Sequence, residues 1–369
     1  MGTFFSVVAG VVVGGIILIA LGWIWLKRKF SKLGDALQEI AAALSGENVP
    51  PFRITVTSAE ADAAWRDEQG MLGRTQELDE LGYEHAGDFR IAEIEGVLLR
   101  AACHRSDACM AVVFEHPQAE SLLVDIVRSH GDHLSVLATN APDQGMHQPP
   151  TKTTVRLAAD ATIADLHQAA MQASRGHEAV AVTPRLFPML YAAAYAAEMD
   201  WRIECGGVTA DEVRAAAAAG GQDEPDEAAI EIVQSQWRIA IQSFVDNEAI
   251  DQFAASGQLS QVELEDKRER IKAVHDRTDR SGLIELIVEA AVTAREAEWD
   301  EEADDYDERY DAAHEAATNA VEAAFRNTEA NDLRSATEAA IAAAEAPVRH
   351  LGSVEKPRHA DLYLFPELT

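Results

Sequence analysis

The stretch from Phe4 to Leu26 restricts the fold of this chain more than any other feature, because its 23 residues carry no charge and are almost all apolar. As a helix, such a run extends about 34 Å, which is enough to cross a hydrocarbon core of about 30 Å. In lipid, only a helix lets a single segment satisfy its own backbone hydrogen bonds. The run therefore predicts a transmembrane helix, with Trp23 and Trp25 at the membrane interface.

The charges on either side of this run predict its orientation. No basic side chain precedes it, and four follow it at once: Lys27, Arg28, Lys29 and Lys32. The positive-inside rule places the N-terminus outside and the rest of the chain in the cytoplasm. A cleaved signal peptide is the alternative, but its basic start, shorter apolar core and small-residue cleavage site are missing. We expect a single-pass protein of a bacterial inner membrane, bound to the lipid bilayer through residues 4–26.

Two patterns near the N-terminus are compatible with a parallel homodimer. Gly10 and Gly14 form a G-x-x-x-G motif, a spacing that lets two membrane helices approach closely. Beyond the basic cluster, apolar residues recur at steps of three and four: Phe30, Leu33, Leu37, Ile40 and Leu44. A glycine-rich span without a partner, followed by an amphipathic helix lying on the membrane, fits the same residues.

The charge of the chain excludes one class of partner. Acidic residues number 63 against 31 basic residues, so the formal net charge is −32. Such a surface repels phosphate, and we therefore expect no nucleic-acid partner. The 369 residues, 47% of them hydrophobic, are enough for two or three compact domains. The three cysteines are too few for a disulfide framework.

Composition divides the chain into four parts. A transmembrane anchor, residues 1–29, is followed by a juxtamembrane helix and linker, residues 30–50, which end at a double proline. Residues 51–221 are expected to form a cytoplasmic domain. Residues 222–369 are rich in alanine, glutamate and aspartate, and we expect an acidic helical domain there.

The cytoplasmic domain shows a hydrophobic period near two, which is typical of strands. The expected strands are Phe52–Thr57, Phe89–Ile94, Val97–His104, Cys109–Glu115, Leu122–Val127 and Leu134–Thr139. The links between the later strands are too short for parallel crossovers, so we predict an antiparallel meander. Its expected buried face comprises Val97, Leu99, Ala101, Met110, Val112 and Phe114.

Helix signals complete the expected fold. A helix is expected at 70–81 and another at 184–201, and capping boxes begin at Thr162 and Thr209. In the acidic part, helices are expected at 283–297 and 312–346, and no strand signal is visible. The predicted fold class is α+β: an N-terminal transmembrane helix, an antiparallel β-meander packed with helices, and an acidic, alanine-rich, all-α C-terminal region.

Several short segments of the cytoplasmic domain resemble a family of uncharacterised bacterial proteins. The segments are Leu81-Gly82-Tyr83, Ala86-Gly87-Asp88-Phe89, Val97-Leu98-Leu99-Arg100-Ala101, Val112-Val113-Phe114-Glu115-His116-Pro117, Thr139-Asn140-Ala141-Pro142 and Glu198-Met199-Asp200-Trp201-Arg202. The resemblance covers about residues 78–215. The family has no assigned activity, so the resemblance implies no catalytic residues.

The chemistry-bearing residues form no recognised motif. If residues 105–108 form a turn, His104 faces Cys109 across a hairpin, and Arg100 shares that face. No C-x-x-C or H-x-x-x-H spacing accompanies the pair, so we predict no metal and no cofactor. For catalysis, four residues at strand ends could converge at one sheet edge: Glu115, His116, Asp125 and Asn140. Almost any meander offers such a set, and a non-enzymatic protein is favoured.

A long segment without hydrophobic pattern follows the last expected strand and is the best candidate for ligand binding. Long loops of this kind are uncommon unless they are functional or disordered. The candidate ligand-binding residues are Asn140, Asp143, Gln144 and His147. A structural role for the loop is the competing interpretation.

Together, these features predict a membrane-anchored protein that acts as a cytoplasmic scaffold or interaction module for an unidentified protein partner. The alternative is a membrane-tethered, ligand-binding sensory domain, which predicts a concave pocket under the loop at 140–150. A hydrolase-type enzyme is a third hypothesis.

Overall fold

The computed structural model describes residues 49–60, 63–115, 119, 121–130, 134–257, 266–276, 278–297, 299, 305–328, 332–355 and 359–367. They belong to two compact units, which meet in the sequence between Trp237 and Arg238. We call these the N-terminal unit and the C-terminal unit. The predicted transmembrane segment, the G-x-x-x-G motif and the apolar residues that recur between Phe30 and Leu44 lie outside the described residues. Among the residues that the structure describes, no helix combines the length and apolar character that a membrane span requires.

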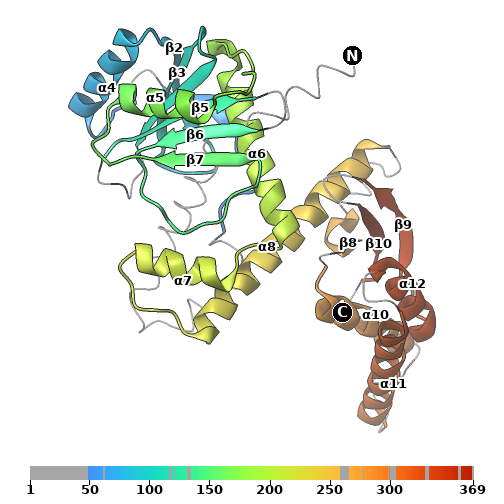
Figure 1. The fold of residues 1–369 in the computed structure, drawn as a ribbon. Helices are drawn as coiled ribbons and strands as arrows, with labels where there is room; N and C mark the ends of the chain where they lie inside the picture. Colours follow the sequence, from blue (N-terminus) through green and yellow to red (C-terminus); the bar gives the residue numbers. More distant parts are fainter. Residues whose placement is uncertain are drawn as a thin grey trace. The chain divides into compact units, whose positions relative to one another are not determined.

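A seven-stranded sheet forms the centre of the N-terminal unit, and its strands follow one another in chain order (Figure 1). The strands are β1 (Val56–Ser58), β2 (Glu84–Ile91), β3 (Leu98–His104), β4 (Cys109–Glu115), β5 (Leu123–Ser129), β6 (Ser135–Thr139) and β7 (Lys152–Arg156). The first six strands pair antiparallel, whereas β7 runs parallel to β6. A parallel return needs a connection of about a dozen residues, and the loop at 140–151 provides it.

Helices cover both faces of this sheet. The helices of the unit are α4 (Glu68–Glu80), α5 (Ile163–Ala173), α6 (Phe187–Cys205) and α7 (Ala210–Ala219), with the 3₁₀ turn η1 (Pro184–Leu186) before α6. On one face, α4 and α5 pack through Met71 and Leu166 onto Ala111 and Ile126 of the sheet. On the opposite face, Glu198 of α6 pairs with Lys152 of β7. Every residue of β4 is therefore buried.

The helix starts follow from local chemistry. The hydroxyl oxygens of Thr162 and Thr209 each accept a hydrogen bond from the amide of the third helical residue, and the carboxylate of that residue accepts one from the threonine amide. These two reciprocal caps satisfy backbone donors that a helix start leaves unpaired. They begin α5 and α7 at the positions that the sequence predicts.

The helix α8 (Glu227–Ala255) begins in the N-terminal unit and ends in the C-terminal unit. Its Ile230, Val233 and Trp237 are buried, and Trp237 packs edge-on against Phe52 with ring centroids 6.1 Å apart. The N-terminal unit thus extends to residue 237, beyond the expected boundary at 221/222.

The C-terminal unit combines helices with a second, smaller sheet. Its elements after α8 are η2 (Arg268–Arg270), β8 (Ile271–Val274), α10 (Arg280–Glu296), α11 (Tyr306–Asn327), α12 (Leu333–Ala344), β9 (Arg349–Val354) and β10 (Ala360–Leu364). The three strands form an antiparallel sheet with β10 in the centre. Ile287, Val321 and Ala340 from the three helices share one core with Tyr363 of β10.

The fold class predicted from the sequence is wrong. The structure is a mixed α/β fold, because β7 adds a parallel strand to the sheet and helices pack on both of its faces. The C-terminal region is not all-α, since it contains β8, β9 and β10. The sequence does not predict β7 because Lys152–Arg156 is polar and lacks the alternation of a half-buried strand. It does not predict the C-terminal strands because they are short and lie among long alanine-rich helices.

Candidate functional site

The β3–β4 hairpin brings a histidine and a carboxylate to one face of the sheet. His104 is the last residue of β3 and lies opposite Cys109, the first residue of β4, as the sequence predicts. The turn between them ends at Ala108, whose φ of +52° is unusual for a residue with a side chain. Asp107 lies in this turn, and its Oδ2 atom is 3.0 Å from Nδ1 of His104.

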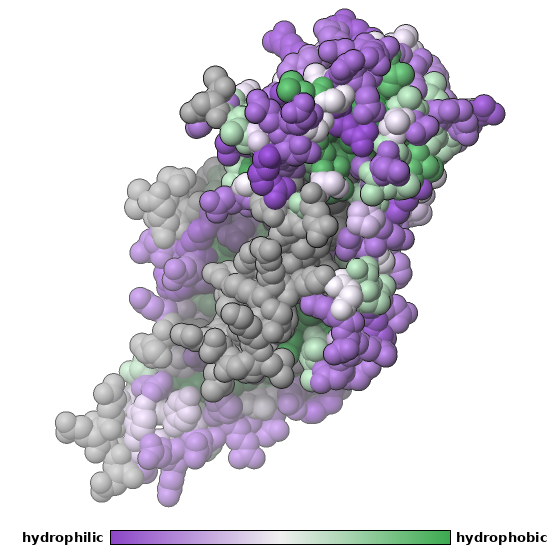
Figure 2. All heavy atoms as spheres, turned by 90° about the vertical axis from the view of Figure 1, so that its left-hand side faces the viewer, coloured by the Kyte–Doolittle hydropathy of each residue, from purple (hydrophilic) through white to green (hydrophobic). Residues whose placement is uncertain are grey.

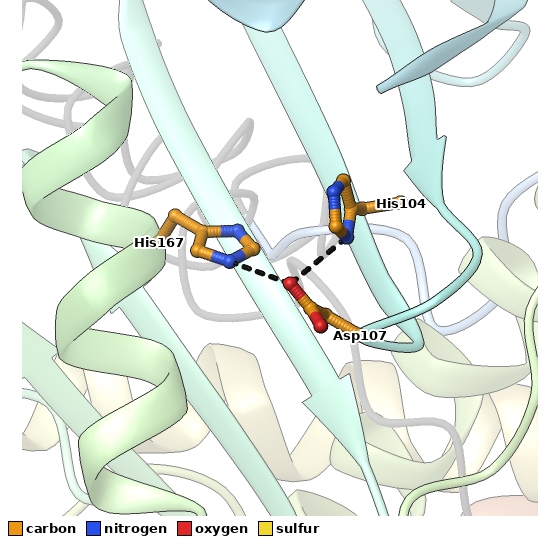
Figure 3. A group of neighbouring side chains, drawn as sticks. All are labelled: His104, Asp107 and His167. Carbon is orange, nitrogen blue, oxygen red and sulfur yellow. Dashed lines mark hydrogen bonds and ion pairs between the residues drawn. The ribbon is translucent and has the colours of Figure 1, made fainter. Parts of the chain in front are cut away.

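Helix α5 adds a second histidine to the same place. His167 follows Leu166, one of the helix residues buried against the sheet, so its ring lies at the edge of the helix–sheet contact. The Nε2 atom of His167 is 3.1 Å from Oδ2 of Asp107. Figure 3 shows both imidazole rings turned toward this one carboxylate oxygen, with His104 and Asp107 on the hairpin and His167 on the helix.

Tyr83, the residue before β2, completes the cluster. Its hydroxyl forms a 2.8 Å hydrogen bond with Nδ1 of His167, the nitrogen that faces away from Asp107. Its ring centroid lies 5.1 Å from that of His104 and 5.7 Å from that of His167. We call Tyr83, His104, Asp107 and His167 the hairpin cluster.

Burial controls the protonation of two residues in this cluster, His167 and Tyr83. It lowers the pKa of His167, although the Asp107 carboxylate opposes the shift, so the neutral imidazole is favoured at pH 7. Burial also raises the pKa of Tyr83 far above its usual value, so the phenol stays protonated. The nearby Cys109 thiol, again because of burial, has its pKa raised to about 12. The cluster therefore offers the neutral imidazole of His167, and the nearby thiol is not a reactive thiolate.

Two of the four loop residues predicted to bind a ligand, Asn140 and Asp143, contact different elements. Asn140 is buried, and its side chain accepts a hydrogen bond from the Val124 amide and donates one to the Ala159 carbonyl. Asp143 forms an ion pair with Arg156 of β7 at 3.2 Å. The structure places these two side chains in structural contacts.

The remaining two candidates lie farther along the loop. Gln144 is half-buried. The backbone of His147 is clamped, because its amide donates to Glu212 and its carbonyl accepts from Arg202, while its ring is 60% exposed. The loop is thus fastened onto α7, which gives the chain its path from β6 to β7.

Gly145 shows how closely the loop packs on α7, and we expect Gly145→Ala to be destabilising. Its φ is +72°, and an added Cβ atom would lie 2.3 Å from the Cβ atom of Ala215. Backbone strain of about 1–2 kcal/mol and overpacking of about 1–3 kcal/mol should both reduce the free energy of unfolding in urea. Gly176→Ala is the matched control, because φ there is +88° but no atom lies within 4 Å of the added Cβ. Equal losses in the two variants would contradict this packing.

The four residues considered for catalysis do not converge where the structure describes them. Glu115 lies on the α4 face of the sheet, where it accepts hydrogen bonds from the amides of Arg66 and Asp67 at the start of α4. Asp125 pairs in register with Val112, three residues from Glu115, and so lies on the opposite face. His116 lies outside the described residues. This set gives no support for a hydrolytic centre.

The hairpin cluster contains residues that the sequence does not single out. The expected facing of His104 and Cys109 locates the hairpin, but Asp107, His167 and Tyr83 follow no motif spacing. Comparisons with protein-family models, curated proteins and solved structures found no match for this chain. The resemblance to a bacterial family therefore stays a prediction, and any assignment of function depends on the residues themselves.

Proposed function

We propose that this chain is a membrane-tethered interaction module with its two folded units in the cytoplasm. The observation that carries the proposal is the uncharged apolar segment Phe4–Leu26 followed by a basic cluster. That arrangement favours a single span with the C-terminal side inside the cell. Gly10 and Gly14 favour a parallel homodimer of the same segment.

The architecture of the folded units supports binding at outer surfaces. Both faces of the seven-stranded sheet are covered by helices, which leaves neither face free to bind a partner. Figure 2 shows a surface that is mostly hydrophilic, with small hydrophobic patches in the part that belongs to the N-terminal unit. Scattered apolar residues of this kind are normal on a surface, so recognition must depend mainly on polar and charged groups.

The charge of the chain indicates the chemistry of the partner. Residues 201–369 carry 38 acidic and 16 basic side chains, which accounts for −22 of the net charge. On α11, four acidic residues are exposed: Asp307, Glu308, Asp311 and Glu315. Electrostatic complementarity favours a protein with a basic surface and disfavours nucleic acid.

We favour this function over a ligand-binding sensory domain because of the packing at the loop. The sensory hypothesis places a pocket beneath residues 140–150. There, Gly145 contacts Ala215 so closely that even a methyl group would not fit. A buried ion pair between Arg202 and Glu212 holds the His147 backbone on the same side.

Membrane association is tested by placing charge in the apolar segment. The double variant Ile16→Arg/Ile17→Arg should move the chain from the membrane fraction to the soluble fraction. Each arginine at the centre of a span opposes insertion by about 2.5–3.5 kcal/mol. Ile16→Leu/Ile17→Leu is the matched control and should stay with the membrane. A C-terminal reporter that matures only in the cytoplasm should be active on the control.

Two outcomes would contradict the proposal. The first is a wild-type chain that appears in the soluble fraction. The second is a C-terminal reporter that stays inactive and is cleaved by protease added outside the inner membrane.

A further inference from the structure

The donor atoms of the hairpin cluster have the spacing of a metal-coordination sphere. Nδ1 of His104, Oδ2 of Asp107 and Nε2 of His167 all lie within 4.8 Å of one another. The two distances that involve Oδ2 are 3.0 and 3.1 Å. Tetrahedral zinc ligands at about 2.0–2.1 Å from the metal lie about 3.3 Å apart, so a small adjustment of the two rings would accommodate an ion.

A second observation comes from His104. Its Nδ1 atom is buried and has no hydrogen-bond partner, although it lies 3.0 Å from the Asp107 carboxylate. A buried polar atom without a hydrogen bond is costly, and a histidine nitrogen that faces a carboxylate must either carry a proton to donate or share a cation with it. A metal ion bound to Oδ2 and to this nitrogen would satisfy both atoms.

Tyr83 supplies the contact that a metal-binding histidine normally requires. If Nε2 of His167 binds a metal, Nδ1 carries the proton and donates it to the Tyr83 oxygen, which lies 2.8 Å away. Such outer contacts fix the tautomer and the ring orientation of a ligating histidine. The tyrosine is itself buried, so its hydroxyl is held in place.

We propose that His104, Asp107 and His167 form a binding site for a divalent transition-metal ion, with Zn²⁺ as the best match. The site uses two imidazole nitrogens and one carboxylate oxygen, a ligand set that suits Zn²⁺, Co²⁺ or Fe²⁺ and is unsuited to Ca²⁺ or Mg²⁺. The three side chains remain 15–33% exposed, so an ion can enter from solvent and keep at least one water ligand.

The neighbouring cysteine is not part of this ligand set. Cys109 faces His104 across the hairpin, but its Sγ atom lies 3.9 Å from Sδ of Met171 and 3.5 Å from the Asp107 carbonyl oxygen. We therefore expect the spectrum of a nitrogen and oxygen site, without the strong charge-transfer band of a thiolate ligand.

The proposal is tested by titrating the full chain, purified in mild detergent and stripped with a chelator, with Co²⁺. We expect visible absorption bands of four- or five-coordinate Co²⁺ that saturate at one ion per chain and are displaced by Zn²⁺. Zn²⁺ should also raise the Tm of the wild-type chain. Co²⁺ that is bound loosely to surface carboxylates stays octahedral and absorbs weakly, so it does not imitate this result.

Variants distinguish the residues that bind the metal from the residues that only contact them. His104→Gln and His167→Gln should each abolish the absorption bands, whereas Tyr83→Phe should weaken the affinity about 10- to 100-fold while keeping the bands. The matched control is His350→Gln. His350 and His359 also flank one carboxylate, Asp361, but Arg334 lies 3.4 Å from that carboxylate and already supplies a positive charge. This control should bind Co²⁺ like the wild type.

Three results would overturn the proposal. One is a wild-type chain that shows only octahedral Co²⁺ at saturating metal, and this measurement needs no variant to fold. Another is a set of bands that survives both ligand variants. The third is a Tm of the wild-type chain that Zn²⁺ does not raise, since the hairpin cluster would then be only a hydrogen-bonded clamp between the β3–β4 hairpin and α5.

Discussion

Replacing Arg202 with methionine is expected to lower the free energy of unfolding of this chain by about 3–5 kcal/mol. The side chains of Arg202 and Glu212 are both 1% exposed, and their charged atoms lie 2.6 Å apart. Burial alone would raise the pKa of Glu212, but the Arg202 charge and the amides of Thr209 and His147 outweigh it, so the pKa is lowered. Without Arg202, a carboxylate would remain buried with no cation beside it.

The loss should extend to the loop, because Arg202 also donates a hydrogen bond to the carbonyl of His147. We therefore expect residues 141–150 to exchange their amide hydrogens faster in Arg202→Met than in the wild type. Hydrogen exchange measures this effect separately from the unfolding free energy. The two measurements together distinguish local loosening of the clamp from a general loss of stability.

Arg214→Met is the matched control for this prediction. Arg214 also pairs with carboxylates, but those of Asp211 and Glu227 are 88% and 84% exposed. Exposed ion pairs contribute about 0–1 kcal/mol, so this variant should unfold almost like the wild type. The double variant Arg202→Met/Glu212→Gln should be more stable than Arg202→Met, because it leaves no unpaired charge. If Arg202→Met and Arg214→Met lost equal amounts of unfolding free energy, the buried ion pair would contribute no more to stability than the exposed one.

The sequence predicts where the strands and helices of the N-terminal unit lie better than it predicts how the strands pair. The strand at Cys109–Glu115 lies where the period of two places it, and the caps at Thr162 and Thr209 begin helices. These signals are local, since they depend on alternation and on hydrogen bonds within four residues. The parallel strand β7 has no such signal, because it is defined by its pairing with β6.

The C-terminal strands illustrate the same limit. The apolar stretch Ala360–Leu364 is visible in the sequence, but its role as the central strand depends on two partners, β8 and β9. Arg349–Val354 contains arginine, histidine and glycine and resembles a loop. Tertiary pairing overrides weak local preference here, as it commonly does in strands.

The hairpin cluster could be predicted only in part. Antiparallel register places His104 opposite Cys109 once the turn is identified. His167 comes from a helix that follows β7 in the sequence, and its approach to Asp107 depends on how α5 packs across the sheet. A single sequence contains no spacing rule that links these two positions, so the site becomes visible only in three dimensions.

Asp125 carries the second large expected effect, because it is an ionisable group buried on the α6 face of the sheet. It is 1% exposed, and its Oδ1 atom has no hydrogen-bond partner. Burial raises its pKa from 3.8 to about 7, although the Thr139 hydroxyl and the charges of Lys152 and Arg156 oppose the shift. Glu198 of α6 adds to the rise. The folded chain therefore prefers the protonated carboxyl group.

The direction of the pH dependence follows from this preference. A raised pKa in the folded state means that the stabilising contribution is complete below pH 3.8 and is lost as the pH rises toward about 7. Each pKa unit corresponds to about 1.4 kcal/mol, so the full change is about 4 kcal/mol. Between about pH 5 and pH 8, the wild type should lose about 3 kcal/mol relative to a variant that cannot ionise at this position.

Asp125→Asn is that variant, since asparagine has the shape of a protonated aspartate without its charge. We expect it to unfold at a higher urea concentration than the wild type at about pH 8, and the advantage should shrink as the pH falls toward about 5. Asp165→Asn provides a control of opposite sign. Hydrogen bonds from the Thr162 hydroxyl and amide lower the pKa of Asp165, so there the wild type loses its advantage as the pH falls. If the stability difference between Asp125→Asn and the wild type is the same at both pH values, the carboxyl group does not titrate in this range and its burial is compensated by contacts other than those described.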